Sequence, residues 1–467
     1  MPTDAATGRL WVLSDLHLAP AGDQCVFRAH AALTSFIDHL STLPMADPPQ
    51  WLVLNGDVFD YLQIPGYEEL SLPLAPRRTG QILDALDAEP GPRNVLRALR
   101  RFTARGHRLS CLPGNHDAEL NLAPVQEVLS ARLGSTTALP PWAGEWRLQV
   151  AGRAVVGRYG HHDDAFNAIS AQRMLGAQAA GDASVALPPG SRLVLQVLNP
   201  FRRAKAADGT PRFPFIDSLP AEQGVLLAVM LMDPKLVARR LPQALGIGAA
   251  ALLRKALMRS GLRRPQLSGQ GAVQTPAVET QSGLGALNGW LADAAGHLAP
   301  TAASAIEYEL DAYFAGAAMG RRDPASGMLA KPGGVRGLLL EALSRCLEES
   351  RASFCSNEAD ALALEAMADW GQGQIAFAGH THAARNLRAR QGAGHYINTG
   401  TWIDQVLPPV GLQAAEVSDW LDRLCQGKVP LWNGHPVAMV DENGPHLLSW
   451  DGQALQSWVD PTESMGS

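Results

Sequence analysis

The segment Leu10–Leu18, LWVLSDLHL, joins a short apolar run to a polar loop that carries an aspartate and a histidine. The same arrangement recurs in Trp51–Asp60, WLVLNGDVFD, and in Arg108–Asp117, RLSCLPGNHD. Short apolar runs that end at turn residues predict buried β-strands. We therefore expect each strand to deliver polar side chains from its carboxyl end, where open α/β sheets place their functional sites.

Later segments repeat this arrangement. Trp146–Val150 and Ala154–Tyr159 form a predicted hairpin that ends at a Gly-His-His tripeptide, and Gln374–Ala378 ends at Gly-His-Thr-His. Between the first two strands, Val26–Leu40 has the apolar spacing of a helix. Strands that alternate with loops and helices predict a layered α/β fold.

The chain divides by pattern into three parts. Residues 1–165 and 371–467 are strand-rich, and the second of these ends in a predicted hairpin of Val437–Val440 and His446–Trp450. Residues 166–370 have mainly helical patterns and read as an insertion, a cap or lid on the α/β core. Its predicted helices are Glu222–Leu231, Ala250–Arg259, Ser304–Met319, Leu338–Arg351 and Asn357–Trp370.

Composition excludes several classes of protein. The 467 residues are 46% hydrophobic, which is too apolar for a disordered chain. The net charge of −6 argues against a stable nucleic-acid complex, because nucleic-acid-binding proteins carry a basic footprint. Five scattered cysteines without C-x-x-C spacing indicate reduced thiols, and no segment resembles a signal peptide or a transmembrane span. We expect a cytoplasmic protein, and nothing in the sequence fixes its oligomeric state.

Metal-capable side chains gather at the predicted strand ends. Six of the thirteen histidines lie in these loops, so the ordered set as a whole favours a metal site over scattered core or surface histidines. The set consists of Asp15, His17, Asp57, Asp60, Asn115, His116, Asp117, His161, His162, His380 and His382.

These motifs resemble the calcineurin-like metallophosphoesterase superfamily. The resemblance covers residues 1–165 and 374–402, and it implies a layered β-sandwich flanked by helices, here with a large helical insertion. The matching elements are Asp15-Leu16-His17, Gly56-Asp57-Val58-Phe59-Asp60, Gly114-Asn115-His116-Asp117, Gly160-His161 and Gly379-His380-Thr381-His382.

The resemblance also implies roles. Asp57 would bridge two ions, with His116 stabilising transition-state charge and protonating the leaving oxygen. Asp60 and Asp117 would orient imidazoles, or act as turn or capping aspartates. The remaining ligands of the first ion would be Asp15, His17 and His382, and those of the second would be Asn115, His380 and a histidine of the Gly-His element.

The chemistry of phosphate explains these residue types. Negative charge protects a phosphoester or phosphoanhydride from nucleophiles. Two divalent ions about 3.5–4 Å apart would neutralise that charge and lower the pKa of a bound water, so that hydroxide attacks phosphorus. Imidazole with carboxylate and amide oxygens suits Mn, Fe, Zn or Ni better than Mg or Ca, and we expect manganese.

One position departs from the family pattern. Tyr159 stands where the family usually has the histidine of a His-Gly pair, so the ligand has moved to His161 or His162, or the second ion lacks one imidazole. We favour His161. On an extended segment His162 would point to the opposite face, whereas Tyr159 would share the face of His161. Asp163 and Asp164 follow, and could bind outer-sphere water or cap the next helix.

The substrate is less constrained than the chemistry. Ser14–Leu18 and Gly56–Asp60 are also similar to bacterial UDP-2,3-diacylglucosamine hydrolases, but those enzymes are shorter and typically have arginine where His116 stands. A phosphorylated small molecule, nucleotide or lipid is therefore expected, with that lipid pyrophosphatase, or a catalytically degenerate metal-binding scaffold, as the alternative. Basic pairs in the insertion either bind phosphate or form solvated helix faces; they are Arg202-Arg203, Arg239-Arg240, Arg254-Lys255 and Arg263-Arg264.

Overall fold

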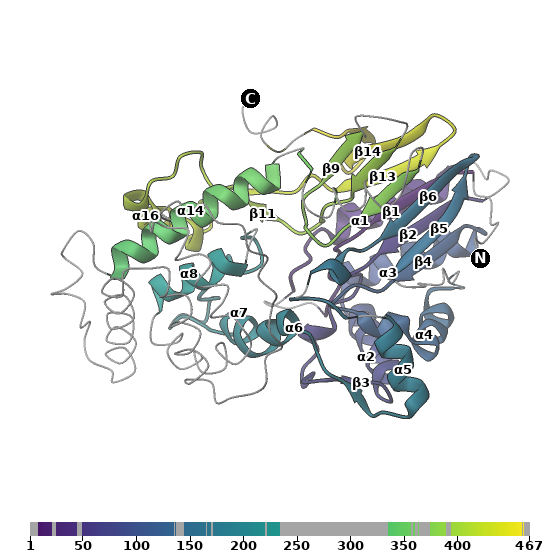
Figure 1. Cartoon of the computed structure of the whole chain (residues 1–467), viewed down its shortest axis with the longest axis horizontal. Coiled ribbons are helices and arrows are strands. Elements are labelled where there is room, and N and C mark those ends of the chain that lie inside the picture. Colours follow the sequence, from purple (N-terminus) through teal and green to yellow (C-terminus); the bar gives the residue numbers. More distant parts are fainter. Residues whose placement is uncertain are drawn as a thin grey trace, which may run out of the picture. The chain divides into compact units, whose positions relative to one another are not determined.

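Contacts along the chain define two compact units (Figure 1). The first comprises Met1–Pro220, Arg351–Leu407 and Pro430–Ser467, and the second comprises Ala221–Ser350 and Pro408–Val429. The computed structural model describes residues 8–20, 25–43, 49–134, 136, 144–164, 166–169, 171–219, 222–233, 335–355, 358–359, 363, 374–388, 394–459 and 461.

The first unit contains a six-stranded sheet with the order β15-β14-β13-β1-β2-β4. Its strands β1, β2 and β4 run parallel, whereas β13, β14 and β15 are joined in antiparallel register. The bounds are β1 Leu10–Leu13, β2 Trp51–Asn55, β4 Arg108–Leu112, β13 Pro436–Asp441, β14 Gly444–Trp450 and β15 Leu455–Ser457.

A five-stranded sheet with the order β5-β6-β8-β10-β9 belongs to the same unit. Strands β6, β8 and β10 are parallel, and β5 and β9 close the two edges in antiparallel register. The bounds are β5 Glu145–Val150, β6 Arg153–Arg158, β8 Ile375–Ala378, β9 Arg385–Arg388 and β10 His395–Asn398.

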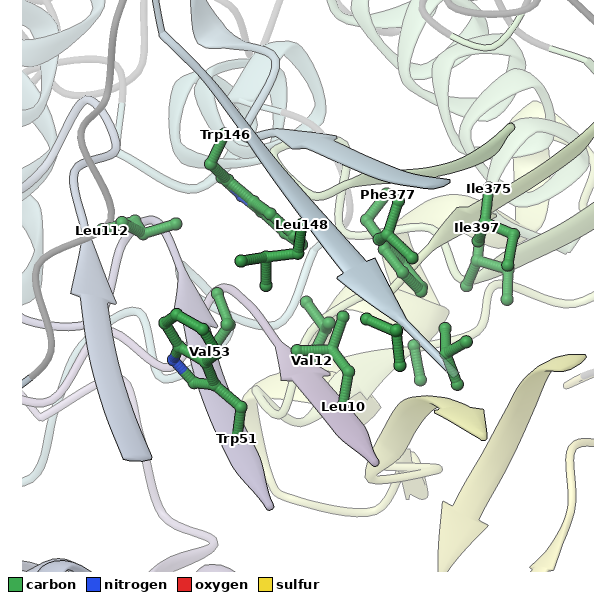
Figure 2. Close-up of a cluster of buried hydrophobic side chains, with 14 of the residues drawn as sticks. Leu10, Val12, Trp51, Val53, Leu112, Trp146, Leu148, Ile375, Phe377 and Ile397 are labelled. Atoms are coloured by element: carbon green, nitrogen blue, oxygen red, sulfur yellow. The ribbon is translucent and has the colours of Figure 1, made fainter. Parts of the chain in front are cut away.

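The two sheets pack face to face around one apolar core, as Figure 2 shows. Leu10, Val12 and Val53 of the first sheet meet Leu148 and Phe377 of the second, and all five are at most 3% exposed. Alternate residues on each strand point into this core, which is the burial pattern of a sandwich. The layered α/β sandwich expected from the sequence is confirmed.

Helices cover the outer face of the six-stranded sheet. Trp11, which alternates with the core residues of β1, meets Phe36 of α1 edge to face at 6.1 Å between ring centroids. Helices α1 and α3 lie against each other beside this sheet (Figure 1). The helix bounds are α1 His30–Thr42, α2 Ala75–Ala88, α3 Pro90–Ala104 and α4 Ala123–Leu133.

The start of the predicted insertion folds as part of the first unit. Three short helical segments follow one another without a break: α6 Pro189–Leu193, the π-helical turn η4 Val194–Leu198 and α7 Asn199–Arg202. The other elements are η1 Tyr61–Gln63, η2 Ala118–Asn121, η3 His161–Asp163 and α5 Ala171–Ala180, with the two-residue strand pairs β3 Leu70–Ser71 with β7 Ser184–Val185 and β11 Gln405–Val406 with β12 Leu431–Trp432.

The described part of the second unit is helical. It consists of α8 Glu222–Met232, α16 Ala414–Cys425 and most of α14 Val335–Cys355. Gly224 of α8 faces α14, because a Cβ there would lie 3.7 Å from Cys346 Sγ.

Several expectations fall outside the described residues. They are the helices Ala250–Arg259 and Ser304–Met319, most of Asn357–Trp370, and the basic pairs after residue 238. In the described part of the chain no helix is both long and apolar enough to cross a bilayer. None of the five cysteines forms a disulfide.

Candidate metal centre

The predicted ligands follow the carboxyl ends of the parallel strands in both sheets. Asp15, Asp57 and Asn115 follow β1, β2 and β4, and His380 follows β8. Backbone hydrogen bonds link these loops: His17 N donates to Asp57 O at 2.8 Å, and Gly379 N donates to Tyr159 O at 3.0 Å. The two parallel strand groups therefore bring residues from distant parts of the sequence to one place.

Left-handed backbone marks five of the predicted ligands. Asp15, His17, Asp57, His380 and His382 have φ values of 54°, 46°, 47°, 69° and 58°. Residues other than glycine rarely adopt this conformation, which costs on the order of 1–3 kcal/mol and is concentrated at functional sites. The fold holds these side chains in place against the preference of their own backbone.

Asp15, His17 and His382 form one potential metal-binding group, with a ligand atom from each lying within 4.8 Å of the others. Asp15 is fully buried, and its Oδ1 lies 3.2 Å from His382 Nε2. Burial raises the pKa of the Asp15 carboxyl, but the imidazoles of His382 and His17 outweigh it and lower that pKa to about 2. Asp15 is therefore an anion ready to bind a cation.

His17, Asp57 and His116 form a second group that shares His17 with the first. His17 Nε2 lies 3.6 Å from Asp57 Oδ2, and the His17 and His116 rings meet edge to face at 4.6 Å. The backbone N of His116 donates to Asp57 Oδ1 at 2.8 Å. Asp57 is thus fixed beside His17 and is 2% exposed.

Asp60 lies behind two of these imidazoles. Its Oδ1 is 3.0 Å from His116 Nδ1 and its Oδ2 is 3.7 Å from His17 Nδ1, while Gln63 Nε2 donates to Oδ2 at 2.5 Å. Burial lowers the pKa of His116, but Asp60 and Asp57 raise it overall to about 9. His116 is therefore positively charged at neutral pH, with Asp60 as its counter-ion.

Asp117 was expected to orient imidazoles or act as a turn or capping residue, and its carboxylate accepts hydrogen bonds from backbone N–H groups. Its Oδ1 accepts from Gly114 N at 2.6 Å, and its Oδ2 accepts from Val58 N at 2.7 Å and Phe59 N at 3.1 Å. These bonds fasten the loop after β4 to the loop after β2, so Asp117 supports the ligand loops through their backbones.

Two histidines predicted to bind the second ion contact groups outside the predicted ligand set. His380 Nε2 lies 3.2 Å from Asp164 Oδ2, and His161 Nε2 lies 3.2 Å from the Ile169 carbonyl oxygen. Among the described residues, neither His161 nor His380 belongs to a potential metal-binding group of His, Cys, Asp or Glu. Asn115 is 7% exposed.

The backbone at His161 corrects one expectation. Residues His161–Asp163 form a turn of 3-10 helix, and the His161 and His162 rings lie only 3.9 Å apart. The expectation that the two point to opposite faces of an extended segment is wrong, because Gly160 with its φ of 114° ends the strand before them.

Orphaned polar atoms test whether these residues fit metal ions. His17 Nε2, Asn115 Oδ1 and His161 Nδ1 are buried and find no hydrogen-bond partner among the described residues. An unpaired buried polar atom is costly, and each of these atoms has a lone pair suited to a cation. The Ile169 carbonyl would keep the proton of His161 on Nε2 and leave Nδ1 as the acceptor. The donor set fits divalent ions.

Ser14 and Thr401 escaped the sequence analysis as supporting residues, and Tyr159 was singled out there without its contact to Asp15. Ser14 Oγ donates to Asp15 Oδ2 at 2.5 Å, and Thr401 Oγ1 donates to the Asp15 carbonyl oxygen at 2.9 Å. Tyr159 is 3% exposed, and its hydroxyl donates to Asp15 Oδ1 at 2.5 Å. Burial and the carboxylates of Asp15 and Asp57 raise the pKa of Tyr159 well above its ordinary value. The adjacency of Ser14 to Asp15 was the only local signal for Ser14 or Thr401.

A small recess adjoins His382. Apart from His382 and Thr401, its lining is apolar and mostly aromatic or proline, so it offers packing surface and no cation for a phosphate. The lining residues are Phe354, His382, Ala384, Thr401, Trp432, Pro436, Trp458 and Pro461.

Buried aspartates and histidines at the ends of parallel strands, with orphaned lone pairs among them, define a metal-dependent enzyme. Residues 8–170 match the family described as calcineurin-like phosphoesterase. No curated protein matches the chain. Residues 8–170 are therefore similar to a calcineurin-like phosphoesterase domain, which supports a metal-dependent phosphoester hydrolase. His380 and His382 lie beyond the matched residues and join the site through the fold.

Proposed function

We propose that this protein hydrolyses phosphate esters or phosphoanhydrides with a dinuclear metal centre. The observation that carries the proposal is the convergence of Asp15, Asp57 and His382 on His17, because buried carboxylates and imidazoles in contact are the ligands of a dinuclear hydrolase. The first ion would be held by Asp15, His17, Asp57 and His382, and the second by Asp57, Asn115, His161 and His380.

The ions, when bound, would neutralise phosphoryl charge and lower the pKa of the attacking water. Asp57 would hold the two ions together as the shared oxygen donor. Asp60 accepts from His116 Nδ1, which leaves the Nε2–H of the His116 imidazolium to stabilise the transition state and protonate the leaving oxygen. Imidazole with carboxylate and amide oxygens suits manganese, and also iron, zinc or nickel.

Within the predicted insertion, residues 189–202 contact the loops that carry Asn115 and Leu62. Ser191 Oγ lies 3.5 Å from the Asn115 carbonyl oxygen, and Asn199 Nδ2 donates to the Leu62 carbonyl oxygen at 2.8 Å. Arg202 pairs with Asp217 at 2.5 Å, and its charge acts on both His116 and Asp60. We propose that this segment shapes the side of the site next to His116, and that the substrate is a phosphorylated small molecule, nucleotide or lipid in the cytoplasm.

The test is metal analysis of purified protein together with hydrolysis of p-nitrophenyl phosphate and bis(p-nitrophenyl) phosphate in added manganese. We expect two ions per chain and turnover of at least one ester. Asp57→Ala should abolish turnover and most metal binding, because Asp57 is the donor shared by both ions. Metal bound without turnover of either ester would favour a degenerate scaffold. Two ions and near-normal turnover in Asp57→Ala would refute the dinuclear centre.

A further inference from the structure

Arg202, the last residue of α7, has a guanidinium to which the proposed hydrolysis gives no step. Its side chain is 10% exposed, and its Nε and Nη2 groups both donate to Asp217 Oδ1, at 2.7 and 2.5 Å. Its Nη1 group donates to Asn199 Oδ1 at 2.6 Å. A guanidinium has five N–H groups. Two of them, one on each terminal nitrogen, therefore remain beyond these bonds within the described part of the chain.

Asn199 fixes this guanidinium beside the loop that carries His116. Asn199 is 4% exposed, and while its Oδ1 accepts from Arg202, its Nδ2 donates to the Leu62 carbonyl oxygen at 2.8 Å. The neighbouring Tyr61 N donates to the His116 carbonyl oxygen at 3.3 Å. The charge of Arg202 accordingly acts on His116. Because His116 would protonate the leaving oxygen, Arg202 lies on the leaving-group side of the site.

The two remaining N–H groups of Arg202 suit an anion. Asp217 and Asn199 fix the orientation of the guanidinium, so its remaining donors are preorganised before a ligand arrives. Guanidinium binds phosphate oxygens through paired N–H groups. An alcohol leaving group presents a single oxygen, to His116, and leaves these donors unpaired, which is costly at a side chain that is 10% exposed. A phosphate on the leaving group would pair with them.

We propose that Arg202 binds a phosphate carried by the leaving group of the substrate, an inference that rests on the proposed function. This phosphate is either joined to the attacked phosphorus through a shared oxygen, as in a phosphoanhydride, or placed on a separate hydroxyl, as in a bisphosphate. In both cases water adds to the attacked phosphorus, the bond from that phosphorus to the leaving oxygen breaks, and the leaving group departs with that oxygen and its own phosphate. Arg202 forms no covalent bond in this step and determines specificity.

Three adenosine compounds test this inference: AMP, ADP, and an adenosine bisphosphate with its phosphates on separate ribose hydroxyls. Their hydrolysis by the full-length protein is measured in added manganese. We expect kcat/KM for ADP or the bisphosphate to exceed that for AMP by about 10–100-fold, the factor for a hydrogen bond to a charged group. The faster of the two shows how the second phosphate is linked. Arg202→Gln should remove this preference and leave kcat/KM for AMP nearly unchanged.

Arg203→Gln is the matched control, because it removes the same charge from the adjacent, exposed position and should keep the preference. Arg202→Lys keeps the charge opposite Asp217 but has only three N–H donors, so it should lose part of the preference, and it serves if Arg202→Gln folds poorly. A wild type without preference over AMP, or an equal loss on all three compounds in Arg202→Gln, would overturn the inference. Metal-dependent turnover of AMP or p-nitrophenyl phosphate alongside either result would leave the proposed function standing, whereas no turnover of any of these compounds would overturn both.

Discussion

His116 is set apart from the predicted ligands by its counter-ion. Its Nδ1 is hydrogen-bonded to Asp60 Oδ1 at 3.0 Å. One ring nitrogen therefore pairs with a carboxylate, and the other remains available as a hydrogen-bond donor. A ligand histidine needs a free lone pair, as at His17 Nε2, whereas a proton donor needs a charged ring. The contrast between these two neighbouring rings separates a binding role from a chemical one.

His116→Ala should therefore keep the metals and slow hydrolysis by roughly 10²–10⁴-fold, the range for loss of a positioned proton donor. Asp60→Asn should slow hydrolysis less and move the alkaline limb of the pH profile to lower pH, because Asp60 raises the pKa of His116. Metal analysis and pH–rate profiles of both variants provide the measurement. Loss of metal from His116→Ala equal to that from Asp57→Ala would make His116 a ligand instead.

Glu119 provides a pH-dependent contribution to stability at a residue away from the ligands. It is 1% exposed, accepts from the Tyr67 hydroxyl at 2.7 Å, and burial raises its pKa from 4.5 to about 7. Since the folded pKa lies above the unfolded one, its favourable contribution is complete below about pH 4.5 and is lost as pH rises through about 7.

Glu119→Gln should remove this dependence, because the amide oxygen accepts the same bond without a charge. We expect the variant to match the wild type near pH 4.5 and to exceed its free energy of unfolding at pH 8 by on the order of 1–3 kcal/mol. Denaturant unfolding at the two pH values measures the difference. Glu127→Gln, an exposed position on α4, is the control and should follow the wild type. A constant offset between Glu119→Gln and the wild type at both pH values would contradict the linkage.

At the scale of elements, the strand ends were predictable and the loops beyond them only in part. Leu10–Leu13 and Arg108–Leu112 are strands with the bounds that their apolar runs predict. The left-handed backbone at Asp15 and the 3-10 turn at His161 have no local signal, because contacts far away in the sequence impose them. The hydroxyl of Tyr159, for example, meets Asp15 from 144 residues away.

In the loop after β4, the absence of a side chain at Gly114 leaves the space that Asp57 occupies. A Cβ at Gly114 would lie 2.1 Å from Asp57 Oδ1 and 2.5 Å from Asp57 N, so Gly114→Ala should displace Asp57. We expect weaker metal binding, together with a loss of about 1–3 kcal/mol from overpacking. Gly80→Ala in α2 is the matched control: nothing lies within 4 Å of its Cβ, and it should stabilise the helix by roughly 0.5–1 kcal/mol. Metal titration and thermal unfolding of both variants test this. Unchanged metal affinity in Gly114→Ala would show that the loop moves to accommodate the methyl group without displacing Asp57.

On the scale of the whole molecule, the site joins two sheets whose strands come from opposite ends of the sequence. Asp15, Asp57 and Asn115 follow the six-stranded sheet, while Tyr159, His380 and His382 follow the five-stranded one. The sandwich core brings the sheets together, and the ligand loops meet above its edge. An ion bound at this place would therefore connect both sheets and stabilise the first unit as a whole.

Removing the metals should accordingly lower the stability of the first unit. Without ions, the side chains of Asp15 and Asp57, both at most 2% exposed, lack the cations that would offset their burial. Manganese at about a hundred times its dissociation constant should add roughly 2.7 kcal/mol to the free energy of unfolding, and a chelator should reverse the effect. Asp57→Ala should gain much less from manganese, since it lacks the shared donor.

Hydrogen exchange locates the effect: protection should rise in peptides that cover 10–18, 51–60, 108–117 and 375–382, and stay constant in α8 and α16 of the second unit. Equal gains in both units, or the same gain in Asp57→Ala as in the wild type, would mean that manganese acts elsewhere than between these two sheets.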